Sequence, residues 1–556
     1  MGLNLDKLRE FLVEGDFLTK EKFDELAKES IAKKRSIQSL ILDNEILKDE
    51  ELGQVIANIT SRRFVNLKDV ELDKNLFNYL PQPVAQRQQA IVFGEDDKYA
   101  KVAVVNPDNT NFLNLLRKRL GKPLQIFLTT EDAIKDQMYN YKESLMSEFE
   151  KLLEQQIKSN NNTDLSAIIR MVDLILMHAY ERNASDVHID PHEKDTIIRY
   201  RVDGVLHDVL TIPQNLHDLI VTRIKVLSKL RTDEHQVPQD GKFQYTVEKS
   251  NIDVRVSIVP TTKGENVVMR LLAERLRQYT LKDIGFSKSD YVKIDKNIRK
   301  PWGMILVTGP TGSGKTTTLY SILKVLNHRE VNIATIEDPV EYNIDGVTQI
   351  QVNPKANLKF VTGLRSIVRQ DPDIIMVGEI RDKETADIAV NSAMTGHLVL
   401  STIHTNDSAT TLPRLLDMDV EQFLVASTVN VIIAQRLIRK ICKKCIHSYS
   451  VDRKELESFA PKKIVDALIG EKEGSVRIYK GKGCSVCKNT GYHGRIGVFE
   501  VLNMDKDIGS LLMKNANAEM IKEKAIEKGM TTMLDDAVEK VLSGVTTLEE
   551  VIRVVR

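Results

Sequence analysis

The chain has 556 residues, of which 42% are hydrophobic and 28% charged, and it is long enough for roughly three or four globular domains. Lys plus Arg and Asp plus Glu both number 79, and this zero net charge argues against a protein whose main role is to coat nucleic acid. No apolar run is long enough to span a membrane, and residues 1–10 lack the apolar core of a secretory signal, so we expect a cytoplasmic protein.

Residues 1–62 contain an internal repeat with an offset of 29 residues. Each copy predicts a short helix, a turn, a polar cap at Thr19 or Asp49, and a second helix. We expect the two apolar faces to pack against each other in a small helical docking module. The matching apolar positions are Leu8, Phe11, Leu12, Val13, Phe17, Leu18, Phe23 and Leu26 in the first copy and Ile37, Leu40, Ile41, Leu42, Ile46, Leu47, Leu52 and Val55 in the second.

Residues 63–145 change to a mixed pattern that predicts a small α+β domain. Strands are expected at 90–93, 101–105 and 124–128, and a helix at 111–120. No catalytic constellation stands out in this part of the sequence. A charged helical stretch at 131–158 then leads into the polar tract 159–163, and we place the linker at residues 146–164.

Residues 165–285 predict a second α+β domain, which we call the middle domain. It begins with an amphipathic helix at 165–180. Asp203-Gly204 is a strong hairpin signal, and Asp240-Gly241 predicts a further turn. The expected strands are 185–190, 197–202, 205–210, 252–258 and 267–272.

Two arginines, Arg255 and Arg270, lie on adjacent predicted strands of the middle domain. In the strand 252–258 the apolar residues alternate, which leaves Arg255 on the opposite face. From the residues alone, each arginine is expected to be a solvated residue on the face of a sheet.

A phosphate-binding loop opens the motor domain, which we place at residues 286–556. The run 309–316 fits G-x-x-x-x-G-K-[ST], and it lies between an apolar strand at 304–307 and a helix that begins at Thr317. Its glycines let backbone N–H groups surround a phosphate, and the helix N-terminus adds the positive end of its dipole. The chain is therefore expected to bind ATP through Gly309, Pro310, Thr311, Gly312, Ser313, Gly314, Lys315, Thr316 and Thr317, with Lys315 at the β- and γ-phosphates and Thr316 at Mg²⁺.

Strands alternate with helices after the loop, which predicts a mostly parallel sheet with the nucleotide at the carboxyl ends of the strands. Carboxylates follow two of these strands, in the run 337–341 and at Glu379. One is expected to hold Mg²⁺ and another to position the attacking water. Cationic candidates for the charge on the γ-phosphate are Arg365, Arg369 and Arg381, and candidates for a γ-phosphate sensor are His397 and His404.

The only four cysteines form two C-x-x-C pairs, Cys442 with Cys445 and Cys484 with Cys487. Two such pairs predict a tetrahedral Cys₄ site, for which Zn²⁺ is the natural occupant, whereas a redox role needs only one pair. The insert between the pairs predicts one helix at 453–468. Downstream, residues 491–502 predict a strand, and Thr547-Leu548-Glu549-Glu550 predicts a capping box for the last helix.

Together these segments resemble the PilB/GspE family of hexameric ATPases in the secretion superfamily, over nearly the full length. The resemblance rests on RYRVDGVL at 199–206, GPTGSGKTTT at 309–318, TIEDPVEY at 335–342, DPDIIMVGEIRD at 371–382, TGHLVLSTIHTN at 395–406 and the paired C-x-x-C. It implies an α/β fold: a RecA-like P-loop ATPase domain with a zinc-binding insert at 440–490, preceded by a PAS-like α+β domain and a helical and α+β N-terminal region.

The resemblance also implies roles for single residues. Glu341 would polarise the attacking water, Glu379 would hold Mg²⁺ through water, and His404 and His397 would sense the γ-phosphate. Arg255 and Arg270 match arginines that reach the γ-phosphate from the middle domain, which reverses their interpretation as solvated residues. Further matching positions in or beside the site are Arg365, Arg369 and Arg381.

The implied function is an ATP-hydrolysing, Mg²⁺-dependent homohexamer that powers type IV pilus assembly at an inner-membrane platform protein. Such a protein would lie peripherally on the inner face of the plasma membrane. The alternative is a type II secretion ATPase that drives a pseudopilus, and the alternative from another class is a RecA-like nucleic-acid motor, which the balanced charge disfavours. A non-enzymatic scaffold is disfavoured by the intact phosphate loop and carboxylates.

The N-terminal repeat resembles a module that binds cyclic di-GMP in some relatives, where each copy begins R-L-G. Here the equivalent positions read Lys7-Leu8-Arg9 and, around Ser36, Arg35-Ile37-Gln38. These departures argue against nucleotide sensing, so we favour docking to a cytoplasmic scaffold protein through the N-terminal region.

Overall fold

A computed structural model describes residues 5–554, except for residues 16, 34–36, 38–39, 42–45, 48, 61, 68–69, 71–75, 77–78, 81, 159–163, 248–249, 273–278, 471–473 and 485. The chain forms two compact units, Met1–Asp164 and Leu165–Arg556. Among the described residues, no helix is both long enough and apolar enough to cross a membrane.

The first unit begins with the helices α1 (Leu5–Glu14), α2 (Lys20–Lys33) and α4 (Asp49–Ile59). Both copies of the repeat contribute to one apolar core, as predicted, and Thr19 caps α2 by accepting a hydrogen bond from the Lys22 N–H at 3.3 Å. The core contains Leu8, Leu12, Phe23, Ile37, Ile41, Leu47, Leu52 and Val55. Two repeat positions, Phe11 and Phe17, are instead exposed, and Leu42 lies outside the described residues.

The second half of this unit is a three-stranded sheet in the order β1-β2-β3, in which β1 and β2 are antiparallel and β2 and β3 parallel. Helix α7 continues without a break to Lys158, through the boundary expected at 145, and the polar tract 159–163 lies outside the described residues. The elements are α5 (Gln82–Gln88), β1 (Ala90–Glu95), β2 (Ala100–Val104), α6 (Thr110–Leu120), β3 (Leu124–Leu128) and α7 (Glu131–Lys158).

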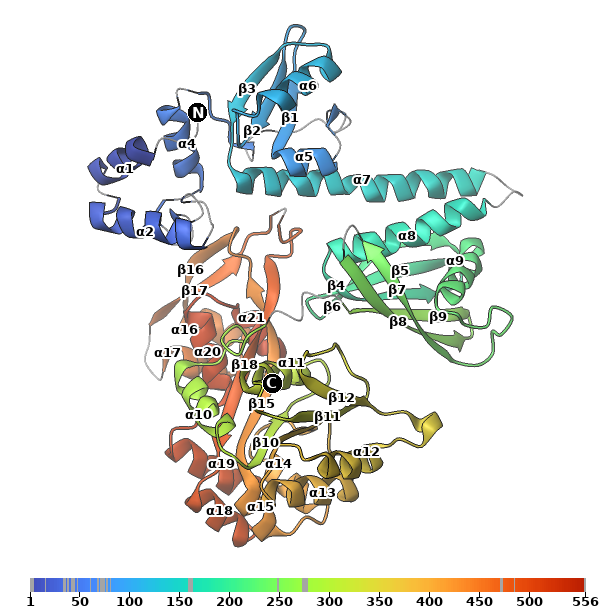
Figure 1. Cartoon of the computed structure of the whole chain (residues 1–556), viewed down its shortest axis with the longest axis vertical. Coiled ribbons are helices and arrows are strands. Elements are labelled where there is room, and N and C mark those ends of the chain that lie inside the picture. Colours follow the sequence, from blue (N-terminus) through green and yellow to red (C-terminus); the bar gives the residue numbers. More distant parts are fainter. Residues whose placement is uncertain are drawn as a thin grey trace. The chain divides into compact units, whose positions relative to one another are not determined.

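The middle domain is an antiparallel six-stranded sheet in the order β6-β5-β4-β9-β8-β7, and α8 and α9 cover one face (Figure 1). The alternating residues of β8 are buried on that face, as predicted, because every second side chain of a strand points to the same side. The elements are α8 (Leu165–Glu181), β4 (Ala184–Pro191), β5 (Asp195–Val202), β6 (Val205–Pro213), α9 (Gln214–Leu227), β7 (Gln239–Val247), β8 (Ser250–Thr261) and β9 (Gly264–Leu272).

One of the two predicted turns is correct. Asp203 and Gly204 have φ angles of 49° and 86° and join β5 to β6 in a tight hairpin. The turn predicted at Asp240-Gly241 is wrong, because both residues lie inside β7. Gly241 serves close packing instead: a Cβ there would come within 3.0 Å of Leu230 and Ser228.

The motor domain is built on a seven-stranded sheet in the order β12-β11-β13-β14-β10-β15-β18. All neighbouring strands are parallel except β15 and β18, which confirms the mostly parallel sheet. Its central strands are β10 (Gly303–Thr308), β11 (Ile333–Glu337), β13 (Ile374–Val377) and β14 (Leu398–Ile403). The edge strand β12 (Val347–Gln351) lies beside β11, and the two long strands at the other side are β15 (Val429–Ile441) and β18 (Tyr492–Asn503).

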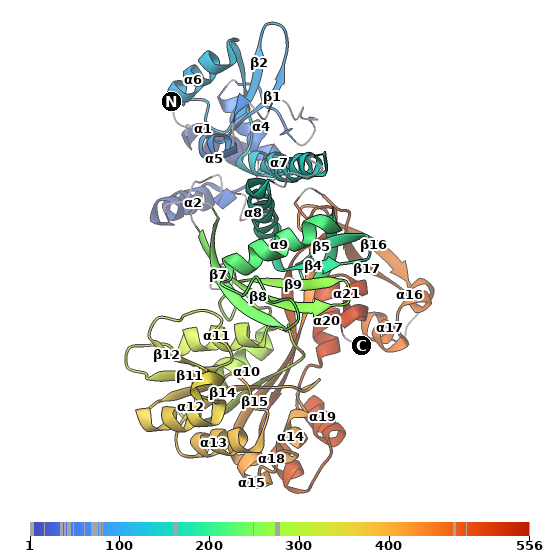
Figure 2. The same ribbon diagram turned by 90° about the vertical axis from the view of Figure 1, so that its right-hand side faces the viewer.

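Apolar cores cover both faces of this sheet, because its central strands are buried on both sides. Helices α10 and α11 pack on one face, and α12, α13 and α15 pack on the other (Figure 2). The elements between the strands are α10 (Lys288–Ile298), α11 (Lys315–Leu326), η4 (Pro354–Ala356), α12 (Phe360–Ile367), η5 (Val368–Gln370), α13 (Lys383–Met394), α14 (Thr411–Leu416) and α15 (Gln422–Thr428).

The insert between the cysteine pairs contains the antiparallel ribbon of β16 (Ile446–Asp452) and β17 (Ser475–Gly481). The single helix expected at 453–468 is two helices, α16 (Arg453–Phe459) and α17 (Lys462–Ile469). Pro461 explains the break, since proline lacks an N–H donor and disfavours helical geometry in the residue before it. The chain then ends in α18 (Lys506–Met513), α19 (Ala518–Glu527), α20 (Met533–Leu542) and α21 (Leu548–Val554).

Candidate functional site

The phosphate loop connects β10 to α11, and its backbone needs glycine. Gly309, Gly312 and Gly314 have φ angles of 146°, 77° and 88°, a region that other residues rarely adopt. At Gly309 a Cβ would also lie 2.4 Å from the carbonyl oxygen of Gln435. The loop is therefore folded tightly over β15, and α11 begins at Lys315 with its N-terminus at the loop.

Lys315 lies over this loop. Its ammonium group donates hydrogen bonds to the carbonyl oxygens of Gly309 at 2.9 Å and Pro310 at 3.1 Å, and burial lowers its pKa. Thr316 and Thr317 follow in the first turn of α11 and are partly exposed, whereas Ser313 is buried. A lysine held at a helix N-terminus beside inward-facing N–H groups is the arrangement that binds polyphosphate.

Glu379 follows β13. It lies at the carboxyl ends of the strands, as the phosphate loop does, because β13, β14 and β10 are parallel neighbours. Its carboxylate is 2.6 Å from the Arg381 guanidinium and 3.3 Å from Nε2 of His404, which follows β14. The structure thus brings together three of the predicted residues. A carboxylate in this position suits Mg²⁺, directly or through water.

Glu341 meets an arginine of the middle domain. Arg255 Nη1 lies 3.2 Å from Glu341 Oε2, and Arg255 Nη2 donates to the Val340 carbonyl oxygen at 2.8 Å. Both side chains are about one-third exposed, so this contact is accessible from solvent. Arg270 is opposite Arg255 in the register of β8 and β9, but its guanidinium pairs with Asp186 at 3.0 Å.

The other three predicted residues, Arg365, Arg369 and His397, contact other partners. Arg365 pairs with Glu384 at 2.6 Å, and Arg369 donates to the Ser366 hydroxyl at 3.3 Å. His397 precedes β14, whereas His404 follows it. The two histidines are therefore at opposite ends of this strand, roughly 20 Å apart at 3.3 Å per residue. His397 Nδ1 is instead 2.8 Å from the Ser392 carbonyl oxygen.

Several residues that support the site were not predicted. Gln435 on β15 donates to the Ser313 carbonyl oxygen and accepts from the Thr318 hydroxyl, both at 2.7 Å, and so holds the phosphate loop. Thr308, the last residue of β10, donates from its hydroxyl to the Ile403 carbonyl oxygen at 2.8 Å and accepts from the Thr405 N–H at 2.9 Å. No sequence signal identifies Gln435, because the long strand β15 that carries it was not recognised.

The four cysteines form a compact cluster in which all ligand atoms lie within 4.8 Å of one another. The Cys442–Cys484 and Cys445–Cys487 sulfur distances are 3.8 Å, and the Cys484–Cys487 distance is 3.7 Å. Tetrahedral Zn²⁺ with bonds of about 2.3 Å requires sulfur separations of about 3.8 Å, so the cluster fits this ion. Burial raises the pKa of Cys442 to about 12 and also raises the pKa of Cys445, whereas hydrogen bonds, first from the N–H groups of Cys484 and Gly491, outweigh burial and lower the pKa of Cys487.

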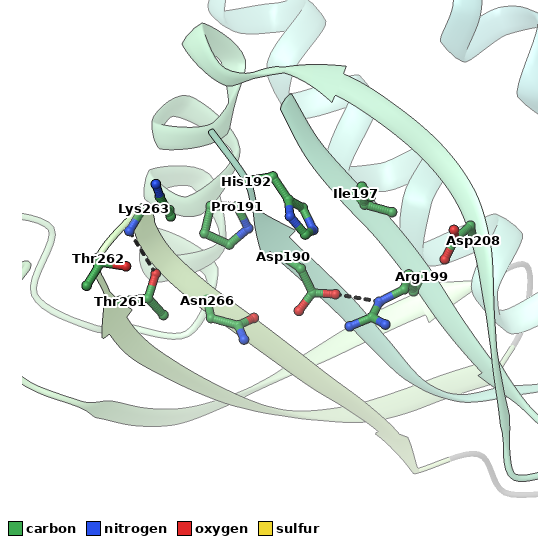
Figure 3. A pocket seen from close by; sticks show the side chains of 10 residues that line it. All are labelled: Asp190, Pro191, His192, Ile197, Arg199, Asp208, Thr261, Thr262, Lys263 and Asn266. Atoms are coloured by element: carbon green, nitrogen blue, oxygen red, sulfur yellow. Dashed lines mark hydrogen bonds and ion pairs between the residues drawn. The ribbon is translucent and has the colours of Figure 1, made fainter. Parts of the chain in front are cut away.

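A separate cavity of about 420 Å³ lies on the middle domain (Figure 3). Its walls carry both charges, with Asp190 paired to Arg199 at 2.7 Å and Lys263 on the β8–β9 turn. Thr261, also in the lining, is six residues from Arg255 along β8, roughly 20 Å at 3.3 Å per residue. None of the predicted site residues lines this cavity.

Comparison with known proteins places these features in a family. The sequence model of the type II/IV secretion system protein family matches residues 161–553, and the MshEN domain matches residues 61–146. The MshEN match falls on the α+β half of the first unit and not on the helical repeat, although the repeat was the part that resembled a cyclic di-GMP module.

Curated relatives cover most of the chain. A type IV pilus assembly ATPase, PilB of Myxococcus xanthus, is 35% identical over 98% of both chains. The type II secretion system protein E of Pseudomonas aeruginosa is 44% identical over 74% of this chain and 78% of its own. Among solved structures, the ATPase DotB of Legionella pneumophila matches at 20% identity with a TM-score of 0.50, over 68% of this chain and 93% of that chain, which supports the fold alone.

Proposed function

The chain belongs to the type II/IV secretion system protein family, whose named relatives are pilus and secretion ATPases, and we propose that it is the motor that powers type IV pilus assembly. The observation that carries this proposal is the 98% coverage of both chains in the match to the pilus assembly ATPase, which includes the first unit. The alternative, a type II secretion motor, is supported by the higher identity of 44%, but over only 74% of the chain.

We propose the reaction ATP + H₂O → ADP + phosphate, with Mg²⁺ neutralising phosphate charge when bound. The N–H groups of residues 311–314 and the Lys315 ammonium would bind the phosphates, and the Thr316 hydroxyl and Glu379 would hold the cation. Glu341 would accept a hydrogen bond from the attacking water and orient it. His404 contacts Glu379 and would report the state of the γ-phosphate.

Arg255 could couple this reaction to movement of the middle domain relative to the motor domain. Its guanidinium contacts Glu341, so the negative charge of a γ-phosphate would compete with Glu341 for it. Binding and hydrolysis would then change how the middle domain is held against the motor domain. Arg381 beside Glu379 is a second cation for the phosphate, whereas Arg270, Arg365, Arg369 and His397 would need to contribute from another copy or another conformation.

The assembly and its partners are also proposals. We propose a homohexamer on the inner face of the plasma membrane that acts on an inner-membrane platform protein, with the first unit bound to a cytoplasmic scaffold protein. The Cys₄ cluster would hold structural Zn²⁺, since all four positions of a tetrahedron are supplied by protein. A nucleic-acid motor is the rival class, and an ATPase rate unchanged by single-stranded DNA would eliminate it.

Deletion of the gene tests the choice of machine. Loss of surface pili with normal levels of secreted enzymes is the expected result. Loss of enzyme secretion with normal pili would instead show that the protein is the motor of a type II secretion system.

A further inference from the structure

The loop that carries Glu341 is held by a buried polar network below the candidate site. Glu337, the last residue of β11, is 2% exposed, and Tyr320 of α11 is fully buried. The Tyr320 hydroxyl donates to Glu337, and the Glu337 carboxylate also accepts from the Thr335 hydroxyl at 2.6 Å. Burial raises the pKa of Glu337, while these hydrogen bonds act in the opposite direction.

The same hydroxyl accepts two hydrogen bonds. The Glu341 N–H donates to the Tyr320 oxygen at 3.3 Å, and Gln349 Nε2 donates to it at 3.3 Å. A phenol hydroxyl offers one donor and two acceptor positions, so every position on Tyr320 is used. Gln349 extends this hydrogen-bond network, because its side-chain oxygen accepts a hydrogen bond from the Ile344 N–H at 2.7 Å.

Tyr320 also joins two parts of the candidate site. It lies four residues after Thr316 on α11, and therefore on the same face of the helix. The helix whose N-terminus faces the phosphates thus also fixes the backbone of Glu341. We propose that Tyr320 is a positioning residue for the reaction, which sets Glu341 relative to the phosphate loop. This inference rests on the proposed ATPase function.

The test is Tyr320→Phe in the full-length protein, measured as steady-state ATPase activity and as affinity for a fluorescent ATP analogue. The variant removes only the hydroxyl, so Glu341 loses its backbone anchor while the phosphate loop is unchanged. We expect kcat to fall between about 10- and 100-fold, the range for displacement of a reacting group by about 1 Å, with KM and nucleotide affinity within about two-fold.

Tyr200→Phe is the matched control, because it removes another buried hydroxyl, which donates to the Ile175 carbonyl oxygen at 2.9 Å in the middle domain. Its kcat is expected to remain normal. If Tyr320→Phe unfolds at a lower temperature than this control, Gln349→Met supplies a second test, since it removes the neighbouring donor and should also lower kcat. A normal kcat in folded Tyr320→Phe, or a change in KM alone, would overturn the inference.

A second comparison separates this inference from the proposed function. If Tyr320 acts through Glu341, Tyr320→Phe lowers the rate no further in a Glu341→Gln background. Full additivity of the two losses would overturn the inference and leave the ATPase intact. Absence of turnover in the wild-type protein would instead contradict the proposed function itself.

Discussion

Two residues that are 86 positions apart in sequence meet at the candidate site: Arg255 and Glu341 are 3.2 Å apart. The carboxylate follows a strand of the motor domain, and the guanidinium comes from a sheet of the middle domain. At this scale the site has two walls. One wall holds Lys315 and the glycine loop, which we propose bind phosphate, and the other brings a positive charge to Glu341, which we propose orients the water.

Replacing Arg255 with Gln tests whether the positive charge from the middle domain contributes to the reaction. Loss of the guanidinium should lower kcat by a factor on the order of 10² or more, since arginines that stabilise phosphoryl transfer contribute still larger factors in other NTPases. Affinity for ATP should change little, because Lys315 and the loop remain. Steady-state ATPase assays check this, with Arg299→Gln as the control, since Arg299 forms an exposed ion pair with Asp295 on α10. Equal activities of the two variants would contradict the assignment.

The candidate site could be predicted where chemistry is local in sequence. Lys315 belongs to a continuous motif, and Glu379 and His404 follow apolar strands, so neighbouring residues reveal them. The role of His397 stays a prediction, because His397 and His404, though close in sequence, lie at opposite ends of one strand. Tyr320, Gln349 and Gln435 act through hydrogen bonds between distant elements, and a single sequence does not contain those distances.

Among elements, periodic strands were predicted well and departures came from single residues. β3 has the predicted bounds, and the alternation in β8 identified its buried face. Gly241 was misread as a turn because close packing against Leu230 requires the same residue type as a turn.

The predicted capping box of α21 is only half formed: Thr547 accepts from the Glu550 N–H at 3.4 Å, but the Glu550 carboxylate turns to Arg439 and Arg553.

This pairing predicts a pH dependence of stability. Burial alone would raise the pKa of Glu550, but hydrogen bonds from Arg553 and Arg439 outweigh it and hold the pKa at about 2, below the ordinary 4.5. A lowered pKa stabilises the folded state above pH 4.5, and this stabilisation is lost as the pH falls towards 2. Glu550→Gln should therefore lower the Tm at pH 7 by on the order of 2 °C, and the difference from wild type should shrink as the pH drops below 4.5.

Thermal denaturation across this pH range checks the effect. The exposed Glu523 of α19 provides the control, since Glu523→Gln should leave the Tm close to wild type throughout. A difference for Glu550→Gln that stays constant down to pH 3 would show that the ion pairs do not cause it.

The cysteine cluster makes a separate prediction for the insert that contains β16 and β17. Cys442→Ser removes one of four ligands, so the zinc content should fall from about one ion per chain and the Tm should fall with it. Nucleotide affinity should remain normal, because the described contacts of the four sulfur atoms lie within the cluster and its own loops and not at the phosphate loop. Metal analysis that finds no zinc in the wild-type protein would contradict the zinc assignment.

At the scale of the whole molecule, the chain combines a first unit of helices and a small sheet with a second unit that contains both walls of the site. Family membership and the general architecture followed from the sequence, because the motifs are spread over nearly the full length. The place of the MshEN domain did not follow from the sequence. The resemblance to a cyclic di-GMP module was seen in the helical repeat, whereas the MshEN match begins only at residue 61. Force generation is proposed for the second unit, where Arg255 connects the two domains.

The central claim is that this unit hydrolyses ATP with Glu341 as the residue that activates water. The most direct test compares the wild-type protein with Glu341→Gln, using steady-state phosphate release and binding of a fluorescent ATP analogue. Glutamine keeps the size of the side chain but accepts a proton poorly, so turnover should fall by at least about 10²-fold while nucleotide affinity stays near normal. Near-normal turnover in Glu341→Gln would contradict the account.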